Sequence, residues 1–364
     1  MTTVRIFAAT SYGSHTPMTG GRLRREHLLA GLAGRGHSVD RLTLDARPGP
    51  ASGTRSLVAA VDLRIAGRIR RADVVLLADV FTAPLVPAVR HAGVPVLLDL
   101  CDSPYRLLAE APRDTPARWA VQVFASAQLL AVMHGLVPMV GRLTYISELD
   151  AQVDRRTVRR LPPHSLVHNG IAAELFEVPL DVDDRGYIGW AADWDYPPNQ
   201  DALRWFAREV ATVLPESVLD RVRLFGPRDP LPSLGRARGR LRYAGFVPSL
   251  STLYRGAALL IAPTLWGAGM KNKVLEPLAA GRPVLTTPAG VEGVPVHIAS
   301  VVDVAEADPR TFARAMEAAV QAAPSPGQAA RRRESVRPLT WPSAVEAMES
   351  ALRAVAEERL DRQV

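Results

Sequence analysis

Short apolar runs alternate with longer amphipathic segments along the first half of the chain. Six runs of strand length predict strands at residues 4–10, 38–44, 73–79, 95–101, 143–147 and 166–168. Apolar residues recur at helical spacing in residues 22–34 and 55–70. Strands that alternate with such helices are typical of right-handed βαβ units. The first half is therefore predicted to form a parallel α/β sheet.

The pattern lapses into a polar linker at residues 178–185 and then starts again. The second half predicts strands at residues 186–191, 221–226, 242–246, 258–264, 283–287 and 299–304, helices at residues 199–213, 249–256, 273–281 and 309–323, and a terminal helix from Pro342 to about Leu360. These elements indicate two Rossmann-like, doubly wound domains, at residues 1–178 and 185–340, followed by a C-terminal helix in residues 341–364. Ligands bind beyond the carboxyl ends of the strands in such sheets, so we expect the site in a cleft between the two domains.

Composition describes a globular protein, with 48% hydrophobic and 22% charged residues. The single cysteine, Cys101, excludes an internal disulfide, and the absence of a signal-like N-terminal segment agrees with a cytoplasmic location. The most apolar stretch, from Trp119 to Val140, is long enough to span a membrane. Because polar residues, Gly135 and Pro138 interrupt it, we predict a buried helix there.

The net charge of +7 fits three kinds of partner: nucleic acid, an anionic membrane surface or an anionic small substrate. Arginines are spread over the whole chain without an aromatic-interleaved basic block, so nucleic-acid binding ranks last. The charge is better explained as steering an anionic ligand or a lipid surface, which allows a peripheral position on the inner membrane face.

Lysine occurs at only two positions, Lys271 and Lys273, whereas the other 42 basic residues are arginine. An ammonium on a flexible stem can follow a phosphate as a point charge, whereas a guanidinium prefers a planar approach. Gly267 and Gly269 precede the lysines, and Pro277 places a helix start at about residues 272–274. Residues 267–273, including Met270 and Asn272, thus predict a phosphate site at a helix N-terminus. The alternative is an ordinary turn with solvated lysines.

A series of short motifs runs in order along the chain. They are Thr19-Gly20-Gly21, Gly36-His37-Ser38-Val39, Val167-His168-Asn169-Gly170-Ile171 with Phe176, Gly189 with Pro198-Asn199-Gln200-Asp201-Ala202 and Trp205-Phe206, Ala262-Pro263-Thr264 with Gly267, Gly269, Lys271, Lys273, Glu276 and Gly281-Arg282-Pro283-Val284, and Thr340-Trp341. Together they resemble glycosyltransferase family 4 of the GT-B glycosyltransferases, in its short sugar-transferase branch.

This resemblance implies a GT-B fold, with an acceptor-binding first domain, a donor-binding second domain and a C-terminal crossover helix that packs back on the first. It implies an EC 2.4, hexosyltransferase-like enzyme that transfers a sugar from a nucleotide diphosphate sugar to a hydroxyl acceptor. The transfer is expected to retain the anomeric configuration and to need neither metal nor cofactor. The acceptor is a glycan, a lipid-linked molecule or a small metabolite; sugar and base stay open.

The resemblance also implies residue roles. Glu276 accepts hydrogen bonds from the ribose hydroxyls, and Lys271 neutralises the departing diphosphate. Gly20 and Gly21 supply backbone N–H donors from the other domain, so that domain closure completes the site.

Three departures from the family pattern leave other functions open. Ala268 occupies the position of a first glutamate, the segment from Trp190 to Trp194 lacks an expected lysine, and a histidine is replaced near Asp99 and Asp102. One alternative is a nucleotide-sugar 2-epimerase, which shares the fold and needs no acceptor. The other is a non-catalytic nucleotide-binding protein, which Ala268 in place of the first glutamate suggests.

Five side chains have two interpretations each. Asp99 and Asp102 end a strand, where a carboxylate can orient a hydroxyl as a catalytic residue or cap a turn. Trp190 and Trp194 either stack on a base or sugar, or pack in the core. Asn199 either caps its helix or faces the cleft. No His, Cys, Asp or Glu group has the spacing of metal ligands.

Overall fold

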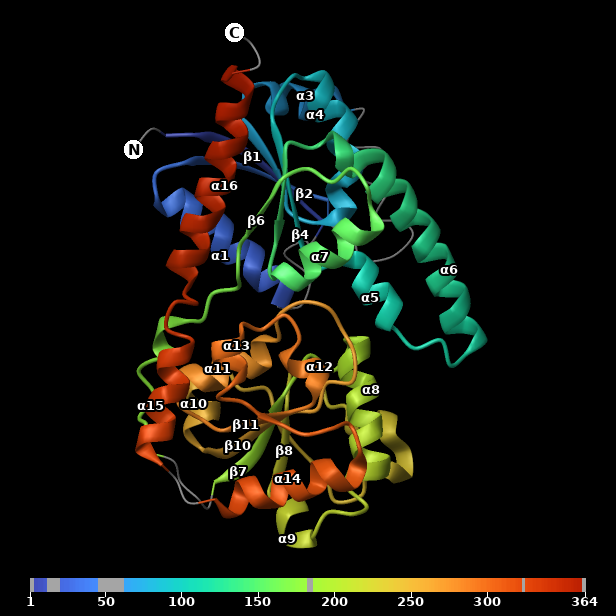
Figure 1. The fold of residues 1–364 in the computed structure, drawn as a ribbon, viewed down its shortest axis with the longest axis vertical. Coiled ribbons are helices and arrows are strands. Elements are labelled where there is room, and N and C mark those ends of the chain that lie inside the picture. Colours follow the sequence, from blue (N-terminus) through green and yellow to red (C-terminus); the bar gives the residue numbers. More distant parts are fainter. Residues whose placement is uncertain (1–2, 12–19, 45–61, 182–185, 323–324, 362–364) are drawn as a thin grey trace. The chain divides into compact units, whose positions relative to one another are not determined.

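The computed structural model describes residues 3–11, 20–44, 62–181, 186–322 and 325–361 of the 364-residue chain (Figure 1). The chain forms two compact units. Unit 1 consists of Met1–Gly170 with Trp341–Val364, and unit 2 of Ile171–Thr340.

Two arginines, of which Arg282 is buried, explain why the segment after residue 170 belongs to unit 2. Arg282, 1% exposed, donates to the carbonyl oxygens of Pro179 (2.8 Å) and Asp181 (2.5 Å), and Arg333 donates to that of Val178. These bonds hold residues 178–181 against the second unit.

Unit 1 is a six-stranded parallel sheet in the order β2-β1-β3-β4-β5-β6. Its elements are β1 (Arg5–Thr10), α1 (Gly20–Gly34), β2 (Ser38–Thr43), α3 (Leu63–Arg70), β3 (Val74–Leu77), η1 (Val80–Leu85), α4 (Val86–His91), β4 (Val96–Cys101), α5 (Pro104–Glu110), α6 (Pro116–Ala131), η2 (Val132–Leu136), η3 (Val137–Met139), β5 (Arg142–Tyr145), α7 (Glu148–Thr157), β6 (His164–Leu166) and α16 (Trp341–Asp361).

Alternate residues of the central strands of unit 1 enter two different cores. Phe7 and Leu77 face the core that includes Met133, whereas Ile6 and Leu76 face the core under α1 and α16. This period of two is the geometry of strands that are covered on both faces.

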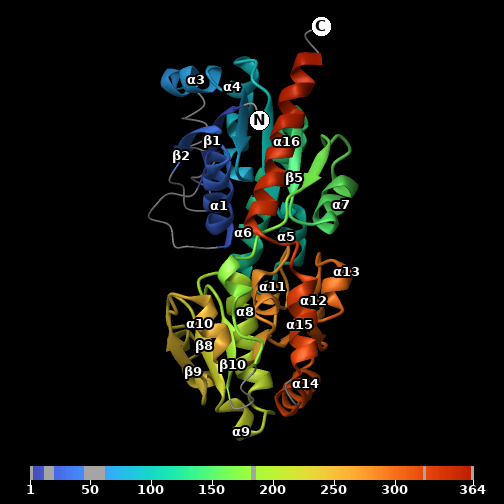
Figure 2. The ribbon, with the colours of Figure 1, turned by 90° about the vertical axis from the view of Figure 1, so that its left-hand side faces the viewer.

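The C-terminal helix α16 packs against α1 in unit 1 (Figure 2). At Gly31 the helices approach so closely that a Cβ would lie 2.3 Å from Cγ2 of Val345. The ion pair of Glu349 with Arg35 and its contact with His37 (3.1 Å) tie α16 to the end of α1. The predicted return of this helix to the first domain is confirmed.

Unit 2 holds a second six-stranded parallel sheet, in the order β12-β11-β10-β7-β8-β9. Its elements are η4 (Ala173–Leu175), β7 (Tyr187–Ala191), α8 (Pro197–Trp205), η5 (Phe206–Val210), α9 (Glu216–Leu219), β8 (Val222–Phe225), η6 (Leu231–Arg238), β9 (Arg242–Gly245), α10 (Leu250–Arg255), β10 (Ala257–Ala262), α11 (Asn272–Ala279), β11 (Val284–Thr286), α12 (Pro288–Val291), α13 (Val296–Ala299), β12 (Asp303–Val304), α14 (Pro309–Gln321) and α15 (Pro326–Ser335). The order reverses between β7 and β10, and this switch point is where doubly wound sheets bind ligands.

The predicted α/β architecture of two doubly wound parallel sheets is confirmed, but two element predictions were wrong. Residues 299–302 are not strand, because Val301 and Val302 donate back to Ile298 and Ala299 and close the turn after α13. The segment from Trp119 to Val140 is helical, but much of it is exposed. Residues 55–61 of the first predicted long helix lie outside the described residues.

Candidate functional site

The loop between β10 and α11, residues 263–271, leaves the switch point of the unit 2 sheet. All six residues of β10 are buried, which fixes where the loop begins. Gly267 (φ 130°) and Gly269 (φ 74°) have positive φ values that favour glycine over residues with a Cβ. Helix α11 then begins at Asn272, as the sequence predicts, with Lys271 as its N-cap residue.

Lys271 closes this loop on itself. Its Nζ donates to the carbonyl oxygens of Gly267 (2.6 Å), Ala268 (3.1 Å) and Gly269 (2.7 Å). In a trans peptide the C=O and the following N–H point in opposite directions. The N–H groups of residues 268–270 therefore point away from the ammonium, an orientation that forms anion-binding nests. Met270 is buried, so it is the backbone of this residue that is available.

Lys273 connects α11 to α8. Its Nζ donates to Oδ1 of Asn199 (2.7 Å), and Nδ2 of Asn199 donates to the carbonyl oxygen of Asp193 (2.8 Å), just after β7. Burial and the nearby charge of Lys271 lower the pKa of Lys273 to about 7. The N-cap residue of α8 is Tyr196, so Asn199 is not the helix cap. Through these two hydrogen bonds Asn199 places the Lys273 ammonium between the ends of β7 and β10.

Glu276 lies one turn into α11. Burial raises its pKa to about 7, although the hydroxyl of Tyr254 donates to Oε2 (3.2 Å) and opposes this rise. Tyr254 comes from α10 and was not singled out from the sequence, because one tyrosine in a helix carries no local signal of its partner. The pair holds a carboxyl group whose ionisation changes near neutral pH.

The two tryptophans after and within β7 belong to the core. Trp190 is 0% and Trp194 3% exposed, and their ring centroids lie 5.2 Å apart in an edge-to-face arrangement. Nε1 of Trp194 donates to the carbonyl oxygen of Phe225 (3.1 Å). The stacking interpretation is wrong for this structure, since neither indole has an exposed face for a ligand.

Asp99 has a structural role in unit 1. It is 2% exposed and forms a bidentate ion pair with Arg24, at 3.0 and 3.1 Å, and it accepts from Thr144 Oγ1 (2.8 Å). Arg24 is itself 1% exposed, and it also binds Asn169 (3.0 Å). The catalytic interpretation of Asp99 is therefore replaced by a structural one, which the sequence could not reveal because Arg24 lies 75 residues away.

The roles predicted for Asp102, as a carboxylate that orients a hydroxyl, and for Gly20 and Gly21, as backbone donors to the diphosphate, stay predictions. Asp102 is half-buried beside Cys101, whose φ of 62° is the one positive value of a non-glycine residue in the described ranges. Gly20 and Gly21 are the first residues of α1 in unit 1, where the backbone N–H groups of a helix have no partner within the helix. Within the described parts of the chain, no group of three or more His, Cys, Asp and Glu side chains has metal-binding geometry.

A family profile described as glycosyl transferases group 1 matches residues 185–322, the part of the chain that carries the β10–α11 loop. The chain contains a group 1 glycosyltransferase domain. No curated protein sequence matches the chain.

Solved structures support the GT-B fold of the chain. Sucrose-phosphate synthase from Thermosynechococcus elongatus is 14% identical (TM-score 0.70; 99% of this chain and 98% of that chain). Anabaena Alr3699/HepE, in complex with UDP and glucose, is 13% identical, with a TM-score of 0.67 over 96% of this chain and 100% of that chain. A trehalose-6-phosphate synthase studied for glycosyl transfer with retention is 12% identical, with a TM-score of 0.66 over 96% of this chain and 99% of that chain. These likenesses show that the chain has the GT-B fold.

Proposed function

We propose that the enzyme transfers a sugar from a nucleoside diphosphate sugar to a hydroxyl acceptor, with retention of configuration and without a metal ion. The observation that carries the proposal is the switch-point site of unit 2. There the β10–α11 loop, the Lys273 ammonium and the Glu276 carboxyl group come together at the N-terminus of one helix.

The loop and α11 suit a diphosphate. As the bond between the sugar and the diphosphate breaks, negative charge grows on the leaving oxygen, and preorganised donors lower the barrier by stabilising it. The N–H groups of residues 268–270, the first N–H groups of α11 and the ammonium of Lys273 provide these donors. They supply positive charge that a metal ion provides in other transferases.

Glu276 suits the ribose. An ionised carboxylate can accept hydrogen bonds from both ribose hydroxyls, and charge-assisted hydrogen bonds are about twice as strong as neutral ones. Tyr254 fixes one carboxylate oxygen, which leaves the other for the nucleoside. Hydroxyl donation favours the ionised form, so nucleoside binding is expected to release a proton from Glu276 near neutral pH.

Retention is proposed by analogy with the trehalose-6-phosphate synthase that shares the fold. Asp99 is occupied by Arg24, which leaves it no part as a nucleophile. In the proposed front-face reaction the acceptor hydroxyl attacks from the side of the leaving diphosphate and gives its proton to the leaving phosphate oxygen. A glycan, a lipid-linked molecule and a small metabolite are all compatible acceptors.

A panel of UDP, GDP, ADP, CDP and TDP in a thermal-shift assay tests the donor site. A nucleotide at about 100 times its dissociation constant adds about 2.7 kcal/mol to the free energy of unfolding. We expect one base to raise the melting temperature most. The corresponding nucleotide sugar is then incubated with an acceptor panel, with and without EDTA, and the anomeric configuration of the product is read by NMR. Sugar epimerised without acceptor indicates the 2-epimerase, and binding without turnover indicates a non-catalytic protein.

The pKa values of Glu276 and Lys273 predict that nucleoside diphosphate affinity is highest near pH 7. Below this pH Glu276 is protonated and accepts fewer hydrogen bonds; above it Lys273 loses its charge. Each limb falls by up to about tenfold per pH unit, because one form of each group binds. Isothermal titration calorimetry with UDP at several pH values between about 5.5 and 8.5 measures both limbs.

Two conservative variants separate the limbs of this profile. Glu276→Gln is expected to flatten the acid limb, so that only the loss of affinity caused by protonation of UDP itself remains. Lys273→Met is expected to flatten the alkaline limb. If Lys273→Met keeps the loss of affinity above pH 7, the assignment of that limb to Lys273 is wrong.

A further inference from the structure

Helix α6 of unit 1 has its apolar side chains turned outward. Trp119 is 57%, Val121 69%, Phe124 50% and Leu130 49% exposed. The buried residue near its middle is polar: Gln122 donates to the carbonyl oxygens of residues 111 and 112 and accepts from Nε of residue 113 (2.7 Å). Figure 1 shows α6 on the opposite side of unit 1 from α1 and α16. An exposed apolar surface of this kind marks a contact site.

The apolar helical segment from Pro116 to Met139 is anchored in unit 1 and does not span a membrane. Pro116–Met139 is long and apolar enough to cross a membrane, with a mean hydropathy of 1.6, but its second half is anchored. Leu129, Met133 and Val137 are at most 7% exposed and belong to the core of the sheet. Pulling the segment into a bilayer would open that core, so the exposed surface formed by Trp119, Val123 and Phe124 can reach only one side of a membrane.

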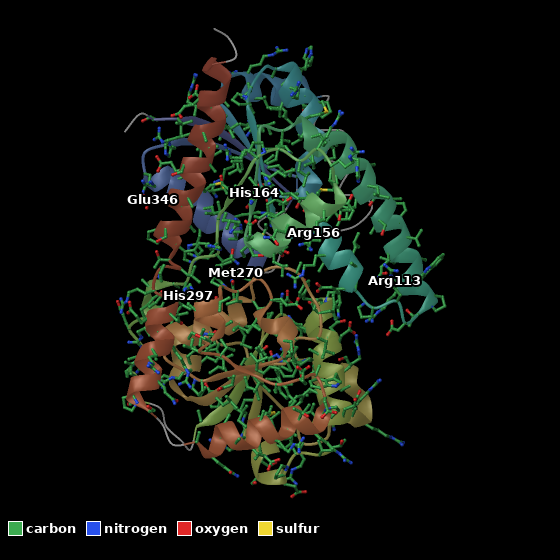
Figure 3. The ribbon with its side chains drawn as sticks, viewed as in Figure 1. Arg113, Arg156, His164, Met270, His297 and Glu346 are labelled. Carbon is green, nitrogen blue, oxygen red and sulfur yellow. The ribbon has the colours of Figure 1, made fainter. Side chains whose placement is uncertain are left out.

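The apolar surface is flanked by arginines. No Asp, Glu, Lys or Arg occurs between Arg118 and Arg142. At the C-terminal end of the segment a cavity of about 460 Å³ is lined by His134, Pro138, Val158, Arg159 and Arg160. Arg155 and Arg156 precede this cavity on α7, and Figure 3 labels Arg156. None of the four arginines at residues 155, 156, 159 and 160 forms an ion pair within the described residues.

The acidic groups around this surface are already paired. Asp114 binds Arg118 (3.2 Å) at the start of α6, and Glu110 binds Arg106 (2.6 Å) on α5. Glu148, at the start of α7, contacts His164 (3.3 Å). The uncompensated charge beside the apolar surface is therefore positive, which matches an anionic partner.

We infer that α6 docks on an anionic lipid bilayer, with Trp119, Val123 and Phe124 in the interfacial layer and headgroup phosphates on Arg159 and Arg160. Tryptophan favours this layer, and arginines near an anionic surface each add attraction. A second copy of the chain fits less well, because a two-fold contact through α6 would bring these same arginine clusters close to each other. Membrane docking would hold the acceptor domain at the surface of the bilayer.

Vesicle flotation with the full chain tests this inference. We expect binding to vesicles that contain phosphatidylglycerol, weaker binding to phosphatidylcholine alone, and release by salt. The double variant Trp119→Ser/Phe124→Ser is expected to lose about tenfold or more in partitioning, because the transfer of two aromatic side chains is lost. The matched control is Phe246→Ser in unit 2, which removes a 65% exposed phenylalanine and is expected to bind as the wild type does.

Arg159→Gln/Arg160→Gln is expected to abolish the preference for phosphatidylglycerol, whereas Arg310→Gln/Arg314→Gln on α14 removes the same charge without this effect. Circular dichroism confirms that each variant is folded. Failure of the wild type to float with anionic vesicles overturns the inference. So does light scattering that shows a dimer dissociated by Trp119→Ser/Phe124→Ser, because α6 then covers a second copy. Neither result depends on glycosyl transfer.

Discussion

Replacing Asp99 by alanine is expected to destabilise unit 1 by about 3–5 kcal/mol, because one partner of a buried ion pair is left without the other. Burial by itself lowers the pKa of Arg24, yet Asp99 and its neighbours raise it above its ordinary value, so the guanidinium is charged in the folded protein. The variant would keep this charge 1% exposed and would also lose the acceptor of Thr144. Differential scanning calorimetry measures the loss as a lower transition temperature.

The matched control removes both charges. Arg24→Met/Asp99→Leu is expected to recover most of the stability, since apolar replacements of a buried ion pair are often neutral or better. Asp102→Ala, at the half-buried neighbouring carboxylate, is expected to cost much less. An Asp99→Ala protein that melts as the wild type does and has lost only its turnover would show that Asp99 is catalytic after all.

The sequence predicted the sheets of both units because their strands are buried on both faces and therefore read as apolar runs. It also located the β10–α11 loop, because the only two lysines of the chain, two glycines and a helix start coincide there. These signals are local: each is contained in a few consecutive residues.

The remaining features depend on partners that are far apart in the chain. Asp99 carries the same local signal whether it faces a substrate or Arg24, and only the fold distinguishes the two. Trp190 lies near the end of β7 and Trp194 just after it, where ligand-binding residues are expected, but Phe206 packs against Trp190 in the core. The apolar stretch of α6 was predicted to be buried and is largely exposed. Hydropathy could not reveal this, because it does not tell on which side of a helix the domain lies.

Replacing Lys271 by methionine is expected to weaken the binding of a nucleoside diphosphate by about 100-fold or more, which corresponds to about 2.7 kcal/mol. The ammonium makes three hydrogen bonds to carbonyl oxygens of its own loop, and hydrogen bonds to charged groups contribute about 1.5–3 kcal/mol each. Without it the three carbonyl dipoles face one another, so the loop is expected to open and the N–H groups of residues 268–270 to lose their common direction. Titration calorimetry with the preferred nucleotide measures the loss.

Two comparisons distinguish how Lys271 acts. If it acts through the loop, Lys271→Arg is also expected to bind poorly, because a planar guanidinium cannot take the place of a compact ammonium among three carbonyl groups. If it only contributes charge, Lys271→Arg should retain most of the affinity. Arg331→Ala, at an exposed arginine of α15, is the control for a change in net charge and is expected to bind normally. Equal affinities of Lys271→Met and Arg331→Ala would show that the diphosphate binds elsewhere, because the loop would then have lost its cation without consequence for the ligand.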